Sequence, residues 1–316
     1  MALFSVIVPY YNDPGRLYHC LESLHNQHFP MDKMEIIVID DCSPVDITNE
    51  VTLRYPEVRF YRLPENRGPA AARNCGISMS HGQYIAFVDS DAMVGPHWLE
   101  ALKREFELGE TVVCGPVLHR NCLLGRITAI TGFGNFLDTR NSYKPDCPSV
   151  NCAVVADEMK NFSYDESLAS VKPNIMIQCE DTLLTRQFVA GGLRIRYAGD
   201  AWVLHDPRLN IRELNRRAFL YGLGFSVSRS INDSLPGYRL HRYLGGGSSI
   251  FLFAVRLVLD VTRMIKYHRT LKISTTNFLP TIIGIIWSRA IYSIGVFQGY
   301  RNSAFCSDMS RHKSSM

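Results

Sequence analysis

The 316-residue sequence lacks the short motifs that identify many nucleotide-binding and metal-binding domains. It contains neither G-x-G-x-x-G nor G-x-x-x-x-G-K-S/T, which excludes the dinucleotide fingerprint and the P-loop. Its nine cysteines include no C-x-x-C pair, and their odd number leaves at least one thiol unpaired. This pattern fits neither a zinc site nor a disulfide framework. Any bound nucleotide must therefore be held by something other than a glycine-rich loop.

The amino terminus has neither the basic segment nor the long apolar segment of a secretory signal peptide. Residues 1–9 indicate a first strand instead. We therefore expect a protein that lies in the cytosol or faces it.

Acidic residues are scarce in the last third of the chain. Residues 211–316 contain 15 Lys and Arg but only 4 Asp and Glu, whereas residues 1–210 contain 19 and 26. The net charge of +4 is therefore the sum of an acidic part, residues 1–210, and a basic part, residues 211–316. This difference predicts different partners for the two parts.

Strands and helices alternate through the first ninety residues. Short apolar runs predict buried strands, and the segments between them have helical periodicity. The expected strands are 4–8, 35–39, 58–63 and 84–88, and the expected helices are 17–28, 46–55 and 70–77. This order predicts an α/β fold with a mainly parallel sheet and helices on both of its faces.

The stretch Tyr84–Asp91 ends in two carboxylates that are one residue apart. Asp89 and Asp91 follow a strand that is apolar throughout, at the edge where open α/β sheets bind ligands. Because strand residues i and i+2 share a face, both carboxylates can converge on a divalent cation such as Mg²⁺ or Mn²⁺. Aspartates are also common in turns and helix caps after strands, so this motif alone leaves both interpretations open.

The chain is less regular after the first sheet segment. Strand-like pieces are expected at 111–117 and 194–198, and an apolar strand at 202–205 ends in a histidine. A helix is expected from residue 178, with Glu180 and Asp181 in its first turn, where the helix dipole favours acids.

The basic back part is expected to be helical. The predicted helices are 212–225, 249–261 and 278–297, with the basic segment 263–272 between the last two and a disordered polar tail at 307–316. Residues 278–297 are long enough to span a bilayer, but Arg289 near their centre costs a few kcal/mol on insertion scales. Helices in the membrane interface fit this pattern best. A packed helical subdomain and a true span are the alternatives.

Four segments of the sequence, in their order, resemble the signatures of the family-two inverting glycosyltransferases, which have the GT-A fold. They are S-V-I-V-P-Y-Y-N at 5–12, V-I-D-D-C-S at 38–43, N-R-G-P-A-A-A-R-N-x-G at 66–76 and D-S-D at 89–91. The match is tight over about residues 4–95 and loose to His205. Cys42 stands where the family often has glycine.

The resemblance implies a set of donor-binding residues. Asp41 corresponds to the aspartate that hydrogen-bonds the nucleotide base, whereas Asp40 is better interpreted as a turn residue. The other residues expected on the donor side are Pro9, Tyr11, Asn66, Arg73, Asp89 and Ser90. A surface ion pair is the alternative role for Arg73, and simple packing is the alternative for Tyr11.

The resemblance also implies a metal site and a catalytic pair. Asp91 is the expected direct ligand of Mn²⁺ or Mg²⁺, with Asp89 nearer the ribose and the water shell of the metal, and with His205 completing the site. Asp181 corresponds to the base that deprotonates the acceptor hydroxyl, and Glu180 is its acidic neighbour. Capping of a helix is the alternative role for these two acids.

We therefore predict a metal-dependent inverting glycosyltransferase that transfers a sugar from a UDP-, GDP- or TDP-linked donor to a hydroxyl group. The expected acceptor is a lipid-linked saccharide or a surface polysaccharide, and no nucleic acid is expected as a partner. Residues 1–210 are the predicted catalytic domain, with nucleotide-sugar binding in 1–95 and the acceptor side in 96–210. Residues 211–316 are the predicted helical region, peripheral on the cytoplasmic face of a membrane.

Two other functions remain open from the sequence. A nucleotidyltransferase also places acids on an α/β sheet, but it would normally have a glycine- and lysine-rich phosphate loop near its start, which this sequence lacks. A sugar-binding assembly partner without catalysis is the second alternative, and only an assay of transfer distinguishes it from an enzyme.

Overall fold

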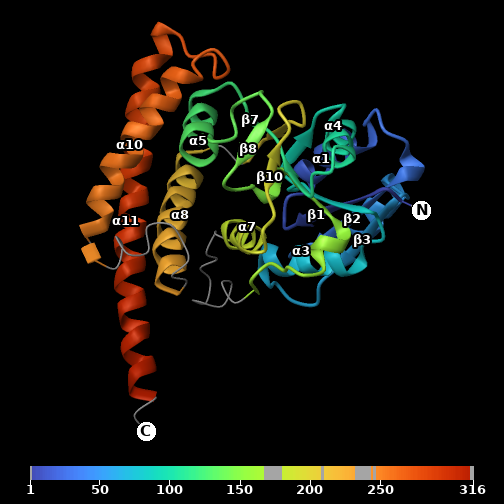
Figure 1. The fold of residues 1–316 in the computed structure, drawn as a ribbon, viewed down its shortest axis with the longest axis horizontal. Coiled ribbons are helices and arrows are strands. Elements are labelled where there is room, and N and C mark those ends of the chain that lie inside the picture. The colour runs from blue at the N-terminus through green and yellow to red at the C-terminus, as the bar shows by residue number, and fades with distance from the viewer. Residues whose placement is uncertain (1, 167–179, 208–209, 232–242, 245–246, 314–316) are drawn as a thin grey trace. The chain divides into compact units, whose positions relative to one another are not determined.

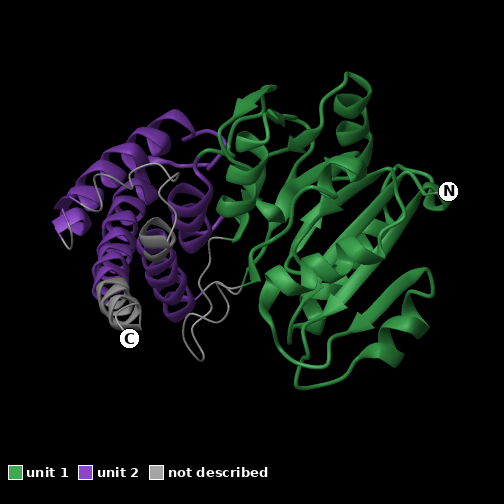
Figure 2. Cartoon of the chain, turned by 60° about the horizontal axis from the view of Figure 1, so that its bottom comes forward, with its two compact units in different colours: residues 1–120, 135–175, 180–207 green, residues 121–134, 176–179, 208–316 purple. Residues whose placement is uncertain are grey.

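The computed structural model describes residues 2–166, 180–207, 210–231, 243–244 and 247–313. The chain divides into two compact units (Figure 2). Unit 1 comprises residues 1–120, 135–175 and 180–207, and unit 2 comprises residues 121–134, 176–179 and 208–316. The segment 121–134, which the sequence pattern gives no reason to separate from its neighbours, thus belongs with the C-terminal helices.

Unit 1 is built on an eight-stranded sheet with the order β3-β2-β1-β4-β9-β6-β10-β8. The first four strands are parallel neighbours and confirm the expected alternation of strands and helices. They are β1 (Phe4–Tyr10), β2 (Met34–Asp40), β3 (Val58–Arg62) and β4 (Tyr84–Phe87), and between them lie α1 (Pro14–His25), η1 (Met31–Lys33), α2 (Thr48–Arg54) and α3 (Gly68–Met79) (Figure 1). Every residue of β1 and of β4 is buried, as a strand inside a parallel sheet requires.

The second half of the sheet is mixed. β9 (Cys152–Val155) lies antiparallel between β4 and β6 (Val112–Cys114). β10 (Ile195–Tyr197) is parallel to β6, and β8 (Ser142–Lys144) is antiparallel to β10. The remaining described helices of unit 1 are α4 (Trp98–Glu107), η2 (Ser149–Asn151), α6 (Ala156–Met159) and α7 (Glu180–Ala190).

A small second sheet has the order β5-β11-β7. β11 (Val203–His205) is antiparallel to β5 (Ala92–Val94) and parallel to β7 (Val117–His119). The register pairs His205 with Ala92 on one side and with His119 on the other. Because Ala92 follows the Asp-x-Asp segment directly, this sheet brings a distant histidine to it.

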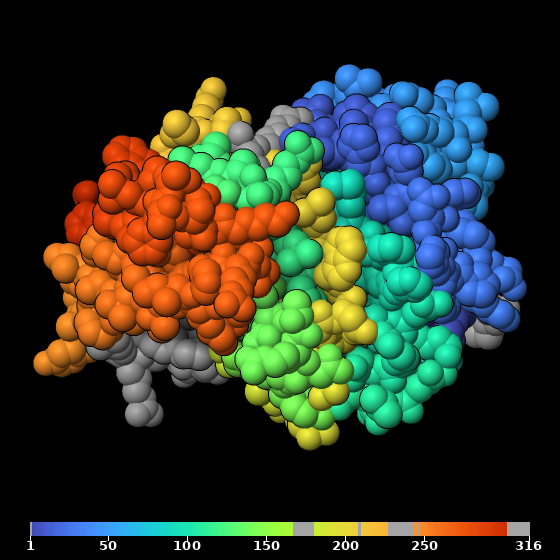
Figure 3. Space-filling view, turned by 90° about the horizontal axis from the view of Figure 1, so that it is seen from above, coloured from blue at the N-terminus to red at the C-terminus, as the bar shows by residue number. Residues whose placement is uncertain are grey.

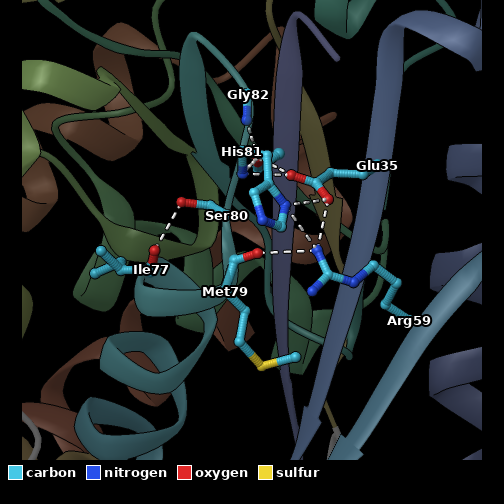
Figure 4. Close-up of polar contacts among 8 residues, drawn as sticks. Glu35, Arg59, Ile77, Met79, Ser80, His81 and Gly82 are labelled. Carbon is cyan, nitrogen blue, oxygen red and sulfur yellow. Dashed lines mark hydrogen bonds and ion pairs between the residues drawn. The ribbon is translucent and has the colours of Figure 1, made fainter. Parts of the chain in front are cut away.

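A cluster of hydrogen bonds around Glu35 lies at the amino-terminal ends of the strands of the large sheet (Figure 4). The Glu35 carboxylate accepts hydrogen bonds from Ser5 Oγ at 2.6 Å, from the His81 backbone at 2.6 Å and from Arg59 Nη1 at 2.7 Å. Arg59 also donates to the carbonyl of Met79, the last residue of α3, at 2.9 Å. The cluster fixes the turn from α3 into β4 and therefore the strand that leads to Asp89.

The described part of unit 2 contains four helices, of which α11 (Thr275–Lys313) is the longest. α5 (Leu123–Phe133), α8 (Ile211–Ile231) and α10 (Ser248–Lys266) all pack against α11 (Figure 1). The expected disordered tail from residue 307 is helical as far as Lys313, and residues 314–316 lie outside the described residues. Among the described residues, Thr275–Arg301 is a helix long and apolar enough to cross a membrane, by length and composition.

Candidate active site

The carboxyl ends of β1, β2 and β4 meet at one edge of the large sheet, as parallel neighbours must. Pro9 is buried within β1, opposite Ile39, and Tyr11 follows the strand with 50% of its surface exposed. Asp41 follows β2, and the half-buried residues Asp89–Asp91 follow β4. This edge therefore collects the expected donor-side residues.

The carboxylate of Asp41 closes the start of α3. Its two oxygens accept hydrogen bonds from the backbone N–H groups of Arg67 at 2.7 Å and Gly68 at 2.8 Å. Asn66 Nδ2 donates to the backbone carbonyl of Asp41 at 3.0 Å. Burial raises the pKa of Asp41, although the two backbone hydrogen bonds act in the opposite direction. Cys42 has φ 56°, which explains why glycine suits this position.

Asp40 has the structural role expected of it. The residue is fully buried, and its carboxylate accepts from Ser43 N at 2.9 Å and from Arg62 Nη1 at 2.7 Å. The bonds fix the turn that presents Asp41.

Arg73 connects two acids that come from distant parts of the chain. The side chain is only 4% exposed, and it donates through Nη2 to Asp89 at 2.7 Å and through Nη1 to Glu180 at 3.0 Å. A surface ion pair, the alternative for this residue, is thus excluded by its burial. Removing one partner of a buried ion pair leaves an uncompensated charge, so Arg73, Asp89 and Glu180 depend on one another and form one ion-pair network.

Tyr164 and Asn74 support this ion-pair network, and the sequence pattern did not single out either of them. The Arg73 guanidinium lies 5.3 Å from the centre of the Tyr164 ring, and the Tyr164 hydroxyl lies 2.9 Å from Ser149 Oγ. Asn74, the residue after Arg73, hydrogen-bonds the Tyr164 backbone. The only signal was the position of Asn74 inside the N-R-G-P-A-A-A-R-N segment; nothing in the sequence marks Tyr164.

Asp89, Asp91 and His205 form the group of described residues that could hold a metal ion. Their ligand atoms all lie within 4.8 Å of one another, and His205 Nε2 lies 3.2 Å from Asp91 Oδ1. Two half-buried carboxylates and one buried imidazole form a donor set that suits Mn²⁺, and carboxylate oxygens also suit Mg²⁺. The residues present therefore fit a divalent cation.

His119 lies behind His205 and was missed by the sequence reasoning. His205 Nδ1 is 3.4 Å from His119 Nε2, on the side of the imidazole away from Asp91. A metal-binding histidine usually uses its second ring nitrogen in such a hydrogen bond, which fixes the tautomer and the ring orientation. His119 belongs to β7, so only the register of the small sheet reveals this pair.

Glu180 and Asp181 begin α7, and the two acids differ in their surroundings. Burial, followed by the negative charge of Glu180, raises the pKa of Asp181 to about 7, whereas Arg73 acts to lower it. The Asp181 carboxylate accepts from the Thr182 backbone at 2.7 Å. A carboxyl group that titrates near neutral pH can accept a proton effectively at that pH.

The expected residues thus form three connected groups at one edge. Asp41 and Asn66 meet at the start of α3, Arg73 joins Asp89 to Glu180, and Asp91 lies beside His205. Pro9 and Tyr11 lie at the end of β1, and Ser90 lies in the turn between the two aspartates of the motif.

A model of the family described as Glycosyl transferase family 2 matches residues 5–187, more than half of the chain. The chain belongs to this family. TarS of Staphylococcus aureus, named a poly(ribitol-phosphate) beta-N-acetylglucosaminyltransferase, is 36% identical over 208 residues, which are 63% of this chain and 35% of TarS. The glycosyltransferase AglE of Haloferax volcanii is 27% identical over 230 residues, which are 71% of this chain and 73% of AglE.

A third relative, a poly(ribitol-phosphate) beta-glucosyltransferase of Bacillus spizizenii, is 33% identical over 155 residues, 48% of this chain and 23% of that protein. The chain therefore matches less than half the length of two of these three family members.

Solved structures show that the fold is GT-A, as expected. Residues 1–349 of Staphylococcus aureus TarS in complex with UDP superpose with a TM-score of 0.54 at 21% identity, covering 93% of this chain and 92% of that one. The mannosyltransferase PcManGT of Pyrobaculum calidifontis, in complex with GDP-Man and Mn²⁺, gives a TM-score of 0.59 at 17% identity over 96% and 86% of the two chains.

Proposed function

We propose that the protein is a metal-dependent, inverting glycosyltransferase that moves a sugar from a nucleoside diphosphate donor to an acceptor hydroxyl group. The observation that carries this proposal is the position of Arg73. Its buried guanidinium bridges Asp89, a member of the metal-binding group, and Glu180, the neighbour of Asp181. The ion-pair network thereby joins the donor side to Glu180, the residue next to the proposed base.

The donor is a UDP-, GDP- or TDP-linked sugar whose nucleotide lies along the ends of β1 and β2. Asp41, Asn66, Pro9 and Tyr11 lie at or next to these strand ends, and Asp41 accepts the N–H of the base. TarS in complex with UDP and PcManGT in complex with GDP-Man share the fold, which supports a donor of this class.

Asp91 and His205 hold Mn²⁺ or Mg²⁺, with Asp89 beside them. When bound, the divalent cation supplies positive charge that offsets the charge of the departing diphosphate. His119 orients His205 through its second ring nitrogen, and Arg73 holds Asp89 in place. Ser90 lies between the two aspartates on the donor side.

Asp181 accepts the proton of the acceptor hydroxyl. Inversion is a direct displacement at the anomeric carbon and needs one such base. The raised pKa of Asp181, about 7, makes it a stronger proton acceptor than an ordinary carboxylate while leaving it ionised in part at neutral pH. Glu180 contributes its negative charge and the link to Arg73.

The acceptor is the hydroxyl group of a surface polysaccharide or a lipid-linked saccharide. Two relatives are named for transfer to poly(ribitol-phosphate), which supports a polymer acceptor. Residues 1–210 perform the reaction, and residues 211–316 hold the protein on the cytoplasmic face of a membrane.

The direct test is a screen of UDP-, GDP- and TDP-sugars with Mn²⁺ and with Mg²⁺, with release of the nucleoside diphosphate as the readout. Asp91→Asn and Asp181→Asn should abolish transfer while the far-UV circular dichroism stays unchanged. Asp157→Asn, at a largely exposed carboxylate on α6, is the matched control and should keep full activity. Full activity in either site variant, or a product that retains the donor's anomeric configuration, would contradict the mechanism.

A further inference from the structure

The outer side of α10 and α11 is an extended apolar surface. We call the exposed apolar side chains of residues 250–259 and 278–297 the hairpin face; they include Ile250 (76% exposed), Val258 (66%), Leu279 (63%), Ile283 (58%) and Ile294 (56%). The atoms of these helices lie together at the surface in the view of Figure 3, in orange and red. An exposed apolar surface of this kind marks a site of interaction.

Three charged residues within the two helices, Asp260, Arg289 and Arg256, contact other side chains or backbone groups of unit 2. Asp260 is fully buried and Arg289 is 3% exposed, and Arg289 Nε donates to Asp260 Oδ2 at 2.5 Å. Arg289 Nη2 also donates to the carbonyl of Thr131 in α5, at 2.7 Å. The Arg256 guanidinium lies 4.6 Å from the centre of the Tyr292 ring. The arginine that makes the sequence a poor membrane span is thus neutralised inside the helical unit.

Within residues 247–301, the exposed charges all have one sign. Between residues 247 and 301 the sequence contains a single acid, Asp260, and that residue is buried. Three cationic side chains are exposed at the end of α10 and in the turn that follows it: Lys266, Arg269 and Lys272. We call these three residues the basic turn.

We propose that the hairpin face and the basic turn dock on the surface of a lipid bilayer that contains anionic lipids, with α10 and α11 lying along the bilayer and not crossing it. Apolar side chains enter the boundary between headgroups and acyl chains, and the basic turn binds anionic headgroups. This deepens the proposed membrane location and gives it a defined surface.

A contact between α8 and α11 argues against a membrane-spanning α11. Trp287, near the middle of Thr275–Arg301, donates its indole N–H to Asn215 Oδ1 of α8 at 2.8 Å. Two residues before Asn215, Glu213 accepts from Arg216 at 2.7 Å and from Arg217 at 3.0 Å. A spanning α11 would therefore carry this ionic cluster into the hydrocarbon core, where charged groups are costly. Docking along the surface leaves the cluster in water.

A second copy of the chain is a poor partner for the same surface. Two copies would bring two basic turns and no exposed acid from residues 247–301 to the interface. An anionic bilayer offers the opposite charge together with an apolar layer. The charge distribution therefore favours lipid over self-association.

Co-sedimentation of the full-length protein with vesicles tests this proposal without any sugar transfer, so a negative result would leave the proposed reaction untouched. We expect binding to phosphatidylcholine vesicles that contain phosphatidylglycerol, with release by high salt. Binding of equal strength to pure phosphatidylcholine, or no binding to either, would overturn the proposal. Protein that resists both high salt and alkaline carbonate and needs detergent for release would show a span.

Variants separate the two parts of the surface. Ile283→Glu and Ile294→Glu should each weaken binding about tenfold or more, because a charge replaces a buried apolar contact. Leu53→Glu, at an apolar side chain of α2 that is 85% exposed, is the matched control and should bind as the parent protein does. Neutralising Lys266, Arg269 and Lys272 together to Gln should weaken binding to anionic vesicles about 100-fold.

Two further outcomes would overturn the proposal. If Ile283→Glu converts a dimer into a monomer without weakening vesicle binding, the hairpin face serves a second copy. The depth of Trp287 is measured by quenching with brominated lipids, as the difference from Trp287→Phe. We expect stronger quenching by bromine near the headgroup than near the acyl-chain ends, and the reverse order would indicate a span.

Discussion

The side chain of Asn74 pairs with the backbone of Tyr164 in both directions. Asn74 Nδ2 donates to the Tyr164 carbonyl at 2.9 Å, and the Tyr164 N–H donates to Asn74 Oδ1 at 3.0 Å. Since the Tyr164 ring lies under the guanidinium of Arg73, this amide fixes the support of the cation that joins Asp89 to Glu180. The pairing links two segments that are ninety residues apart in the sequence.

Asn74→Ala should therefore lower both stability and turnover. The substitution leaves a carbonyl and an N–H of a buried residue without partners, which costs about 1–3 kcal/mol of unfolding free energy. Looser support of Arg73 should lower kcat more than it raises the KM of the donor. Urea denaturation and steady-state kinetics measure these effects. Ser78→Ala, on an exposed side chain of the same helix, is the control; equal behaviour of the two variants would contradict a positioning role for Asn74.

The pH dependence of transfer should report the charges around Asp181. A base must be ionised, so kcat/KM should rise with pH through the Asp181 pKa of about 7, which is raised mainly by burial. Glu180→Gln removes a negative charge that raises this pKa and should move the rising limb to lower pH. Arg73→Gln removes a charge that lowers the pKa and should move the limb to higher pH.

The opposite direction of these two shifts is the decisive feature, because both variants are also expected to be slow. Glu57→Gln is the control, because Glu57 is not among the main contributors to the pKa of Asp181. This variant should leave the pH of the rising limb unchanged. Shifts of the same sign in the Glu180 and Arg73 variants would exclude Asp181 as the titrating base.

The same pKa predicts that Asp181 makes the free energy of unfolding decrease as the pH rises toward neutral. The pKa of Asp181 is about 7 in the folded protein, whereas the ordinary value for an aspartate is 3.8, so the folded state binds more protons between these two values. Its contribution to stability is thus fully present below pH 3.8 and is lost as pH rises through 7. The stability of the parent protein relative to Asp181→Asn should fall over this window and stay level above it. Thermal unfolding of both proteins measures the difference, and a rise with pH would contradict the assignment.

His119 should affect metal binding without binding the metal itself. Removing the hydrogen-bond partner of a metal-binding histidine typically costs 10–100-fold in affinity. His119→Leu should therefore weaken Mn²⁺ binding by that factor, measured by titration calorimetry in the absence of donor. His97→Leu, at a largely exposed histidine of unit 1, is the matched control. Unchanged Mn²⁺ affinity in His119→Leu would contradict the proposal that His119 orients His205 as a metal ligand.

Local sequence patterns predicted the first half of the sheet and the residues at its edge. β1, β2 and β4 are buried on both faces, so their apolar runs are continuous and easy to identify. The side chains that follow such strands meet at one edge because parallel neighbours end together. The positions of Asp41 and Asp89 at this edge were therefore predictable from the strands that precede them, whereas their expected roles came from the resemblance to the family.

Pairings between distant segments were not predictable in this way. The insertion of β9 between β4 and β6 depends on contacts that leave no local pattern. The same holds for His119, which reaches His205 through the register of β7 and β11, and for Tyr164. From the sequence, Arg289 was identified only as a charge inside an apolar segment, because its buried partner Asp260 lies 29 residues away on another helix.

The packing of α8 on α11 depends on glycine at their contact, which gives a final prediction about unit 2. A Cβ added at Gly295 would lie 2.1 Å from the carbonyl oxygen of Phe219, and one at Gly222 would lie 2.0 Å from that of Tyr292. Gly295→Ala should therefore force the helices apart and destabilise unit 2 by about 1–3 kcal/mol. Gly132→Ala in α5 is the matched control, since a Cβ there meets nothing within 4 Å. Because alanine is the better helix former, the control should gain up to about 1 kcal/mol. Urea denaturation of the full chain measures both, and a Gly295→Ala protein as stable as the parent would mean that the two backbones are not in close contact.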